Sequence, residues 1–482
     1  MSVKWDVVII GSGIGALTCG AFLAKAGMRV KVLEKHYRIG GYAHSFNRGG
    51  FRFESGVHSV PMGKGGYIQT LLKALDIENR IETISHDSMY SAGIDNERWV
   101  MPATLDGIKE SLCSSFPHER SNVLNLFSDM DSLYKSIVGP LLNFETKGNE
   151  TNPTALKKYQ EHTYQSYIES YIKDHKLQQL LYSQWPFTGL TPECTSTTFF
   201  SLLYYVHAVE GSHYLKGGFE TLADALGTVI TERGGEICTK SNVTKLHCEN
   251  GHVKHALLES GETITGDHFI SNASPHHLLE TLLEGPSVNK LWLRRVKQLP
   301  LAASSVAVYL GLDCDISSLL PQNMLFWYKH SDFKQIQERI RSASSDEIDH
   351  LVLLRTPGAS EKQTLFLMTY FNHDYTNNWQ GAKDQIAKKM VDTSEQIIPG
   401  LSKHIQCQVT ASPSTFERYS GNTGGSLYGF ANTSDRYSEA KIPMQTFIPN
   451  LYQTGHWCRG GGIWNVMESG FTVSKMLLKK TV

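Results

Sequence analysis

The chain has 482 residues, enough for two or three domains, and its 46 basic and 47 acidic side chains give no electrostatic reason to expect a nucleic-acid partner. Its eight cysteines contain no C-x-x-C pair, which favours reduced thiols in a cytosolic protein over a disulfide framework or a zinc site. No run approaches the roughly 18 apolar residues of a membrane span, and the first strand begins too early for a cleaved signal, so we expect a cytoplasmic protein and leave peripheral contact with a membrane open.

The first predicted elements are an apolar strand and a glycine-rich turn. Residues 7–10 form the short apolar run that is typical of a fully buried parallel strand. The next six residues, Gly-Ser-Gly-Ile-Gly-Ala, match the G-x-G-x-x-G/A pattern of dinucleotide-binding proteins. In this pattern Gly11 permits the tight turn, Gly13 lets the backbone approach a pyrophosphate, and Ala16 lets the following helix pack close to the strand.

The residues that follow supply the context that this pattern needs. A helix over residues 17–26 would direct its free N–H groups at the phosphates, and a second strand over residues 29–33 leads to Glu34. Glu34 stands about 20 residues beyond the glycines, where a carboxylate binds ribose hydroxyls and disfavours a 2′-phosphate. We therefore expect NAD or FAD, rather than NADP or a merely structural βαβ unit.

A second glycine pair and a further strand come next. Gly40 and its neighbour allow another close approach of the backbone, either to the same pyrophosphate or to a flavin ring. Arg38 is a candidate phosphate contact, with an exposed arginine at a helix end as the alternative. Residues 51–58 alternate as a strand does and end in a turn that carries Glu54 and His58.

Residues 6–60 resemble the flavoprotein group that contains phytoene desaturase, carotenoid isomerase and retinol saturase. The resemblance rests on GSGIGAL, LEK, GGYAHSF and GFRFESGVHSV, and the last two segments are most similar to the retinol-saturase branch. One departure is Glu54, which stands where the family usually has Asp. The resemblance extends to residues 214–275 and 421–478 and is weak between these blocks.

The segment up to residue 214 is predicted to be mainly helical. We expect helices over residues 67–75, 105–116 and 123–138, followed by an exposed polar loop over residues 145–153. The next stretch is dense in aromatic residues: Tyr164, Tyr167, Tyr171, Tyr182, Trp185, Phe187, Phe199, Phe200, Tyr204, Tyr205 and Tyr214. These residues form either an ordinary helical core or the lining of a pocket for a long apolar substrate. The resemblance favours the lining for at least some of them.

A second sheet is predicted in the later part of the chain. Apolar runs over residues 304–312, 325–328, 350–354 and 364–371 read as strands, which we expect to form the substrate cavity together with the aromatic region. The charged segment 334–347 is expected to be a solvated helix or loop. His373 and Asp374 lack a third ligand at a recognisable spacing, so no metal site is expected.

The last predicted unit is a strand that leads through a glycine turn into a helix, over residues 450–478. The resemblance implies that this segment lies against the flavin. The N-terminus of its helix would there stabilise negative charge on a reduced flavin. His456 replaces the Asp of many relatives, so the usual acid contact to the sugar chain of the flavin is not expected.

The resemblance implies an α/β fold with a Rossmann-type FAD-binding domain and a discontinuous, mixed-sheet plus helical substrate domain. We expect the FAD-binding domain to take residues 1–75, 214–299 and 421–482. The substrate domain is expected to take residues 76–213, as a helical and aromatic-rich part, and residues 300–420, as a sheet. Only one nucleotide fingerprint is present, so an external electron donor or acceptor is expected.

The candidate site residues combine the fingerprint with the family's motifs. The residues expected to bind FAD are Gly11, Gly13, Ile14, Gly15, Ala16, Glu34, Lys35, Arg38, Gly40, Gly41, His44, Ser45, Val243, Asn272, Gly455, Gly462, Ile463 and Trp464. The candidates for catalysis are His44, Glu54, His58, His456 and Glu468, each with a structural role or a flavin contact as the alternative. Histidine is the natural proton donor, because its unperturbed pKa lies near neutrality.

The expected function is an FAD-dependent reaction at carbon–carbon double bonds of a long apolar polyene or isoprenoid, of carotenoid or retinoid type. Reduction is our first expectation, because of the similarity to the retinol-saturase branch. A desaturase or a redox-neutral cis–trans isomerase would use the same scaffold. Two further alternatives are an amine-oxidase-like flavoenzyme, which shares the fingerprint, and a lipid escort protein without redox chemistry.

Overall fold

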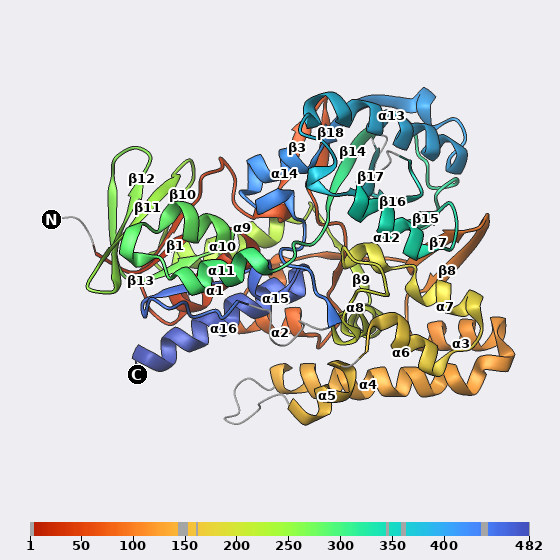
Figure 1. Cartoon of the computed structure of the whole chain (residues 1–482), viewed down its shortest axis with the longest axis horizontal. Coiled ribbons are helices and arrows are strands. Elements are labelled where there is room, and N and C mark those ends of the chain that lie inside the picture. Colours follow the sequence, from red (N-terminus) through yellow and green to blue (C-terminus); the bar gives the residue numbers. More distant parts are fainter. Residues whose placement is uncertain are drawn as a thin grey trace.

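The computed structural model describes residues 4–142, 153–160, 162–343, 347–357, 363–434 and 442–481. A mainly parallel sheet with its helices occupies the left of Figure 1. A second, mainly antiparallel sheet lies at the upper right, and a layer of helices lies below it. Across the described residues, no helix combines the length and the apolar character that are needed to cross a membrane.

The first sheet is parallel in its centre. Its parallel strands lie in the order β10 (Glu236–Cys238), β2 (Val30–Leu33), β1 (Trp5–Ile10), β13 (Thr263–Ser271) and β19 (Leu451–Gln453). The N-terminal part of β13 pairs with the antiparallel strand β12 (His252–Leu258), which pairs with β11 (Val243–Glu249). Val7, Val8 and Ile9 are fully buried, because helices or strands cover both faces of the sheet there, and this burial explains the uninterrupted apolar run.

The helix of the first βαβ unit, α1 (Ile14–Lys25), packs closely against α9 (Glu220–Glu232) and α16 (Ile463–Thr481). Glycines allow this closeness. A Cβ on Gly20 would lie 2.8 Å from the Cδ1 of Ile230 in α9, and a Cβ on Gly470 of α16 would overlap the carbonyl oxygen of Gly15. The strand–helix–strand unit predicted from residues 7–33 is confirmed.

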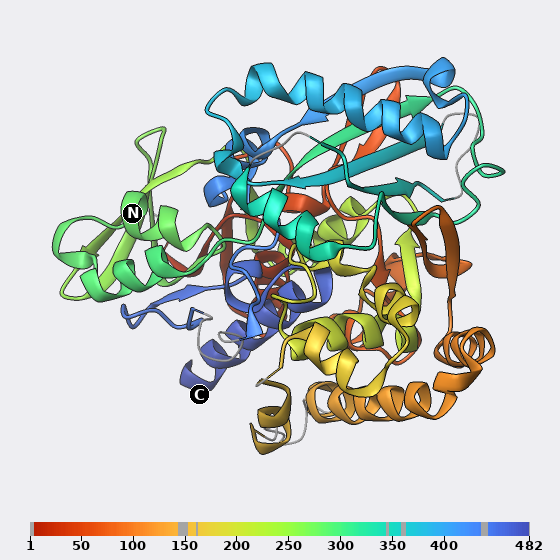
Figure 2. The same cartoon turned by 45° about the vertical axis from the view of Figure 1, so that its right-hand side comes forward.

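The second sheet joins two segments that lie far apart in the sequence. Its strands lie in the order β18 (Ile405–Ala411), β14 (Ser304–Leu312), β17 (Gln363–Phe371), β16 (His350–Arg355), β15 (Met324–Tyr328), β7 (Ser88–Ile94) and β8 (Glu97–Pro102). The pair β7–β15 is parallel and the other pairs are antiparallel. Helix α13 (Trp379–Ile397) covers the outer face of the sheet, as Figure 2 shows. Because β7 and β8 belong to it, the segment 76–213 is less purely helical than expected.

The helical layer contains α3 (Leu105–Ser115), α4 (Arg120–Leu142), α5 (Pro153–Gln160), α6 (Tyr164–Tyr171), α7 (His175–Tyr182) and α8 (Thr197–Glu210). Local signals start several of these helices: Asp174 accepts a hydrogen bond from the backbone N–H of Leu177 at 3.0 Å, which caps α7. The rings of Tyr164 and Phe200 stack at 3.9 Å and fasten α6 to α8. Of the polar loop predicted at 145–153, residues 145–152 lie outside the described residues.

The fold also contains several shorter elements. They are the hairpin β3 (Ser45–Arg48) and β4 (Phe51–Glu54), the small sheet of β5 (Val60–Pro61), β9 (Ser212–Leu215) and β6 (Thr83–Ser85), and the helices α2 (Tyr67–Ala74), α10 (Pro275–His277), α11 (Lys290–Gln298), α14 (Pro413–Ser420) and α15 (His456–Arg459). The hairpin reaches the second sheet, where a Cβ on Gly311 of β14 would lie 2.5 Å from the ring of Phe51.

Helix α12 (Phe333–Ser342) corrects one expectation. Its segment was predicted to be solvated, yet Ile336 and Arg339 are buried. The Arg339 guanidinium donates from Nε to one carboxylate oxygen of Asp349 at 2.6 Å and from Nη2 to the other at 2.8 Å. From the sequence alone such an arginine is predicted to be exposed to solvent, because only the fold brings the buried aspartate close enough to pair with it.

Candidate functional site

A cavity of about 830 Å³ lies where the two sheets and the helical layer meet. Segments that follow the parallel strands β1, β2, β13 and β19 form one end of it, and each segment begins where its strand ends. In open α/β sheets this edge, at the carboxyl ends of the strands, is where ligands bind. The other end is lined by the second sheet and by the helical layer.

The glycine loop forms the floor of the first end. Gly11, Gly13, Ile14 and Gly15 line the cavity, and Ala16 lies behind them as a fully buried spacer. Gly11 has a φ of +88°, which glycine adopts without strain, and its N–H donates to the Leu33 carbonyl at 2.8 Å. No side chain caps α1 and its first turn holds no acid, so the free N–H groups are left for an anion.

Glu34 is held in place at the end of β2. One carboxylate oxygen accepts hydrogen bonds from the backbone N–H of Ser12 at 2.8 Å and from its hydroxyl at 2.7 Å. The other oxygen accepts from the N–H of His36 at 2.7 Å. The side chain is buried and lines the cavity, which fits an acid that receives ribose hydroxyls.

The basic candidates next to Glu34 differ in their surroundings. Lys35 lines the cavity, and burial lowers the pKa of its ammonium group. Arg38 also lines it, but its guanidinium forms an ion pair with Glu220 at 3.2 Å. Ser45 does not line the cavity and donates to Glu54 at 3.2 Å.

The glycine pair brings a second segment of backbone against the loop. Gly40 and Gly41 line the cavity and have φ values of +106° and +58°. A Cβ on Gly41 would lie 3.3 Å from the Cα of Gly13. The two loops therefore approach each other closely, and both face the end of the cavity where the pyrophosphate is expected.

The remaining cofactor candidates approach from the other strands. Asn272 follows β13, and its amide nitrogen donates to the Thr454 carbonyl at 3.1 Å. Gly455 follows β19 with a φ of +96°. Both residues line the cavity, together with Val243, Gly462, Ile463 and Trp464. The start of α16 therefore faces the same cavity as the start of α1.

Three of the proposed catalytic residues line the cavity, and all three are histidines. His44 donates from Nδ1 to the Gly41 carbonyl at 2.6 Å, and burial lowers its pKa. The ring of His58 packs on Phe366 at 4.4 Å between centroids. The Nε2 atoms of His58 and His456 have no hydrogen-bond partner among the described residues. Burial lowers the pKa of His58 to about 3 and that of His456 to about 4.

The two proposed catalytic carboxylates lie outside the lining. Glu54 accepts from the Tyr214 hydroxyl and from the Phe219 N–H, each at 3.0 Å, and thereby fixes β4 to the start of α9. Glu468 accepts from Arg459 at 2.9 Å and from Thr472 at 2.8 Å. Both side chains are buried in these networks. We therefore do not place them among the groups that touch a substrate.

The apolar end of the cavity is lined mainly by residues that the sequence analysis did not single out: Leu202, Leu203, Val206, His207, Tyr309, Leu354, Phe366, Met368, Phe416 and Tyr428. Of the aromatic residues proposed as lining, Phe187 and Phe199 do line it, and the others belong to the core or to other contacts. Strand alternation was an available signal for part of this set, since Phe366 and Met368 stand two residues apart on one face of β17.

The geometry of the cavity fits a dinucleotide. The cavity offers an anion-binding helix start, a buried acid at the ribose position and close backbone loops at one end, and it continues into an apolar space. At the junction, His456 and Trp464 carry ring nitrogens without hydrogen-bond partners among the described residues. These residues fit FAD, because its nucleotide part needs the anion-binding and ribose-binding end of the cavity and its flavin ring needs the more apolar surroundings next to it. Fold and site together define an FAD-binding oxidoreductase.

Comparison with known proteins identifies the family. Residues 17–478 match the family described as flavin containing amine oxidoreductase, and the chain belongs to this family. Human all-trans-retinol 13,14-reductase is 25% identical, over 99% of this chain and 86% of the relative. The 4,4′-diapophytoene desaturase of Methylomonas sp is 24% identical, over 98% and 95%, and the chloroplastic prolycopene isomerase of Arabidopsis thaliana is 24% identical, over 97% and 81%. The resemblance to the desaturase, isomerase and saturase group is confirmed.

Solved structures confirm the fold class. An oxidoreductase from Methanosarcina mazei superposes with a TM-score of 0.69 at 17% identity, over 98% of this chain and 100% of that one. Putrescine oxidase bound to putrescine superposes with a TM-score of 0.67 at 12% identity, over 99% of each chain. At these identities the likeness shows the fold alone. With the family match, the expected FAD cofactor and the oxidoreductase class are confirmed.

Proposed function

We propose that the enzyme reduces a carbon–carbon double bond of a long apolar polyene or isoprenoid of carotenoid or retinoid type. The observation that carries the substrate class is the apolar end of the cavity, which continues directly from the cofactor loops. Such a space suits a flat hydrocarbon chain. The named activities of the reductase, desaturase and isomerase relatives support the same substrate class. The direction, reduction, is proposed from the similarity of GGYAHSF and GFRFESGVHSV to the retinol-saturase branch.

The lining also argues against an amine substrate. Among the described residues around the cavity, Glu34 is the one carboxylate, and it lies at the nucleotide end. A buried ammonium group needs a paired charge, or strong hydrogen bonds, to offset its lost hydration. Among the described residues the apolar end supplies no acid for this purpose, which favours a hydrocarbon over an amine as the substrate.

The residues that line the cavity have different roles in the proposed reaction. Bound FAD supplies hydride transfer at its N5 atom. The loops around Gly13 and Gly40 hold the cofactor, while Phe187, Phe366 and Met368 align the substrate and exclude water from it. Saturation also needs a proton at the neighbouring carbon, and we propose His58 as its source because Nε2 has no competing partner among the described residues.

The direction of the reaction is tested anaerobically. The flavin of the purified protein is photoreduced, polyenes of several lengths are added, and the flavin spectrum and the product mass are followed. We expect flavin reoxidation with a product two hydrogens heavier. A flavin that stays reduced while the polyene changes only its geometry would make the enzyme an isomerase, and desaturation by the oxidised enzyme alone would make it a desaturase.

We further propose that the enzyme works in the cytoplasm with an external electron donor or acceptor and meets its insoluble substrate at a membrane surface. The cysteines without a C-x-x-C pair support the cytoplasmic location, the single nucleotide fingerprint supports an external redox partner, and the apolar cavity supports the membrane contact. Sedimentation with liposomes tests the membrane contact. We expect the purified flavoprotein to sediment with vesicles, and recovery of all of it in the supernatant would contradict the contact.

A further inference from the structure

Three side chains with different donor atoms meet on the second sheet, away from the cofactor cavity. Asp313 and Cys314 directly follow β14, and His404 directly precedes β18. Because these strands are antiparallel neighbours, the end of one lies beside the start of the other. The Asp313 N–H donates to the His404 carbonyl at 3.2 Å, which holds the two segments together.

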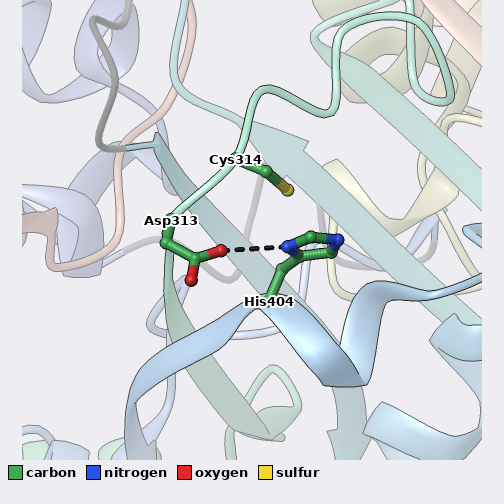
Figure 3. Close-up of side chains that lie close together, drawn as sticks. All are labelled: Asp313, Cys314 and His404. Atoms are coloured by element: carbon green, nitrogen blue, oxygen red, sulfur yellow. Dashed lines mark hydrogen bonds and ion pairs between the residues drawn. The ribbon is translucent and has the colours of Figure 1, made fainter.

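Figure 3 shows the three side chains converging from these two segments. One oxygen, sulfur or nitrogen atom from each lies within 4.8 Å of the corresponding atoms of the other two. In a tetrahedral zinc site, with metal–ligand bonds of about 2.0–2.3 Å, neighbouring ligand atoms are about 3.3–3.8 Å apart. A bound ion would require the 2.9 Å contact between Asp313 and His404 to lengthen slightly and any wider separation in the cluster to shorten.

We propose that Asp313, Cys314 and His404 bind one zinc-type divalent cation. A thiolate, an imidazole and a carboxylate are the ligand types that zinc takes in proteins. The side chains of Asp313 and His404 are 48% and 46% exposed, so water has access to the fourth position. No zinc site was expected from the sequence, because the eight cysteines contain no C-x-x-C pair. His404 lies 91 residues beyond Asp313, so only the fold brings the two side chains together.

A neighbouring side chain orients two of the proposed ligands. Gln406 donates from Nε2 to one oxygen of Asp313 at 2.7 Å, which leaves the other oxygen facing Nδ1 of His404 at 2.9 Å. The metal takes the place of the proton that these two atoms share, and the imidazole binds as the tautomer protonated on its other nitrogen. Formation of the sulfur–metal bond releases the thiol proton of Cys314 to solvent.

The charge distribution favours a cation over an activated cysteine nucleophile. A reactive thiolate needs electropositive surroundings, whereas Cys314 is flanked by Asp313 and Asp315. Asp315 is not a fourth ligand, because Ser317 and Gln363 already donate to its carboxylate at distances of 2.7–2.9 Å. Asp315 adds negative charge beside the cluster without binding the metal.

The site would act on the sheet that borders the substrate cavity. The pairing of β14 with β18 shifts register between Gly311 and Leu312, next to the cluster, so a bound metal would fasten the two strands beyond this irregularity. Val409 and Ala411 of β18 line the apolar end of the cavity. The metal would thereby have a structural role for that wall.

Cobalt binding tests the proposal on the complete flavoprotein. Chelator-treated protein is titrated with Co²⁺, and ligand-field absorption is read at wavelengths longer than those at which oxidised flavin absorbs. We expect one equivalent to bind, Zn²⁺ to displace it, and Cys314→Ser and His404→Gln to weaken binding by at least about tenfold. Flavin content reports that the variants are folded.

Matched controls are available on the same sheet and near it. Cys407→Ser removes a half-buried thiol from β18, and His373→Gln removes an imidazole that contacts Asp374 and Glu417. Both controls are expected to bind cobalt as the unaltered chain does. Equal binding by Cys314→Ser or His404→Gln, or no stoichiometric binding by the unaltered protein, would overturn the site. The readout uses no substrate, so it is independent of the proposed reaction.

Discussion

Gly13→Val is expected to yield a folded protein that purifies without flavin. Gly13 stands immediately before α1, where the pyrophosphate approaches the free N–H groups. A Cβ at this position would overlap Oδ1 of Asn272, and Asn272 is itself held by its hydrogen bond to Thr454. We expect the affinity for FAD to fall at least about tenfold, which corresponds to about 1.4 kcal/mol, as measured by the flavin-to-protein absorbance ratio after gel filtration.

Two further variants make this result specific. Gly139→Ala places a Cβ in α4 where no atom other than those of its chain neighbours and of the helix's own backbone lies within 4 Å. This variant is expected to keep its full flavin content. The double variant Gly13→Val/Asn272→Ala removes the side chain that the new Cβ would meet. It is expected to remain free of flavin, because the valine still blocks the phosphate position. Full flavin content in Gly13→Val would contradict the assignment of this loop.

The cofactor end of the site was predictable because its signals are local. Residues 7–33 form a strand, a turn, a helix and a second strand that are consecutive in the chain, and the glycines act within a few residues of one another. The position of Glu34 was predictable for the same reason, because Glu34 directly follows β2 in the chain. Nothing in this unit depends on a distant segment for its identification.

The substrate end was not predictable in this way, because tertiary packing decides which face of an aromatic element meets the cavity. Tyr164 and Phe199 lie in the same aromatic stretch, yet Tyr164 stacks in the helical core while Phe199 lines the cavity. The pairing of β7 with β15 joins segments more than 200 residues apart. Glu54 stands in a motif near the cofactor, but its three hydrogen-bond donors turn it away from the cavity.

His58→Gln is expected to slow polyene reduction by about 10²–10⁴-fold while leaving flavin content unchanged. The physical reason is the loss of the proposed proton donor beside Phe366. Burial lowers the pKa of His58 to about 3, so about one molecule in ten thousand carries the proton-donating imidazolium at pH 7. The measurement is the rate at which photoreduced enzyme is reoxidised by substrate, followed from pH 7 to pH 5.

The sign of the pH dependence follows from this depressed pKa. Lowering the pH raises the imidazolium fraction up to tenfold per unit, so the reaction of the unaltered enzyme is expected to accelerate. Negative charge on a reduced cofactor would raise the pKa and move the acceleration to higher pH without reversing it. His58→Gln should lose this dependence, and His268→Gln, which alters a half-buried histidine outside the cavity lining, should keep it. A loss of rate in His58→Gln with a flat pH profile in the unaltered enzyme would show that His58 positions the substrate and that the proton comes from another group.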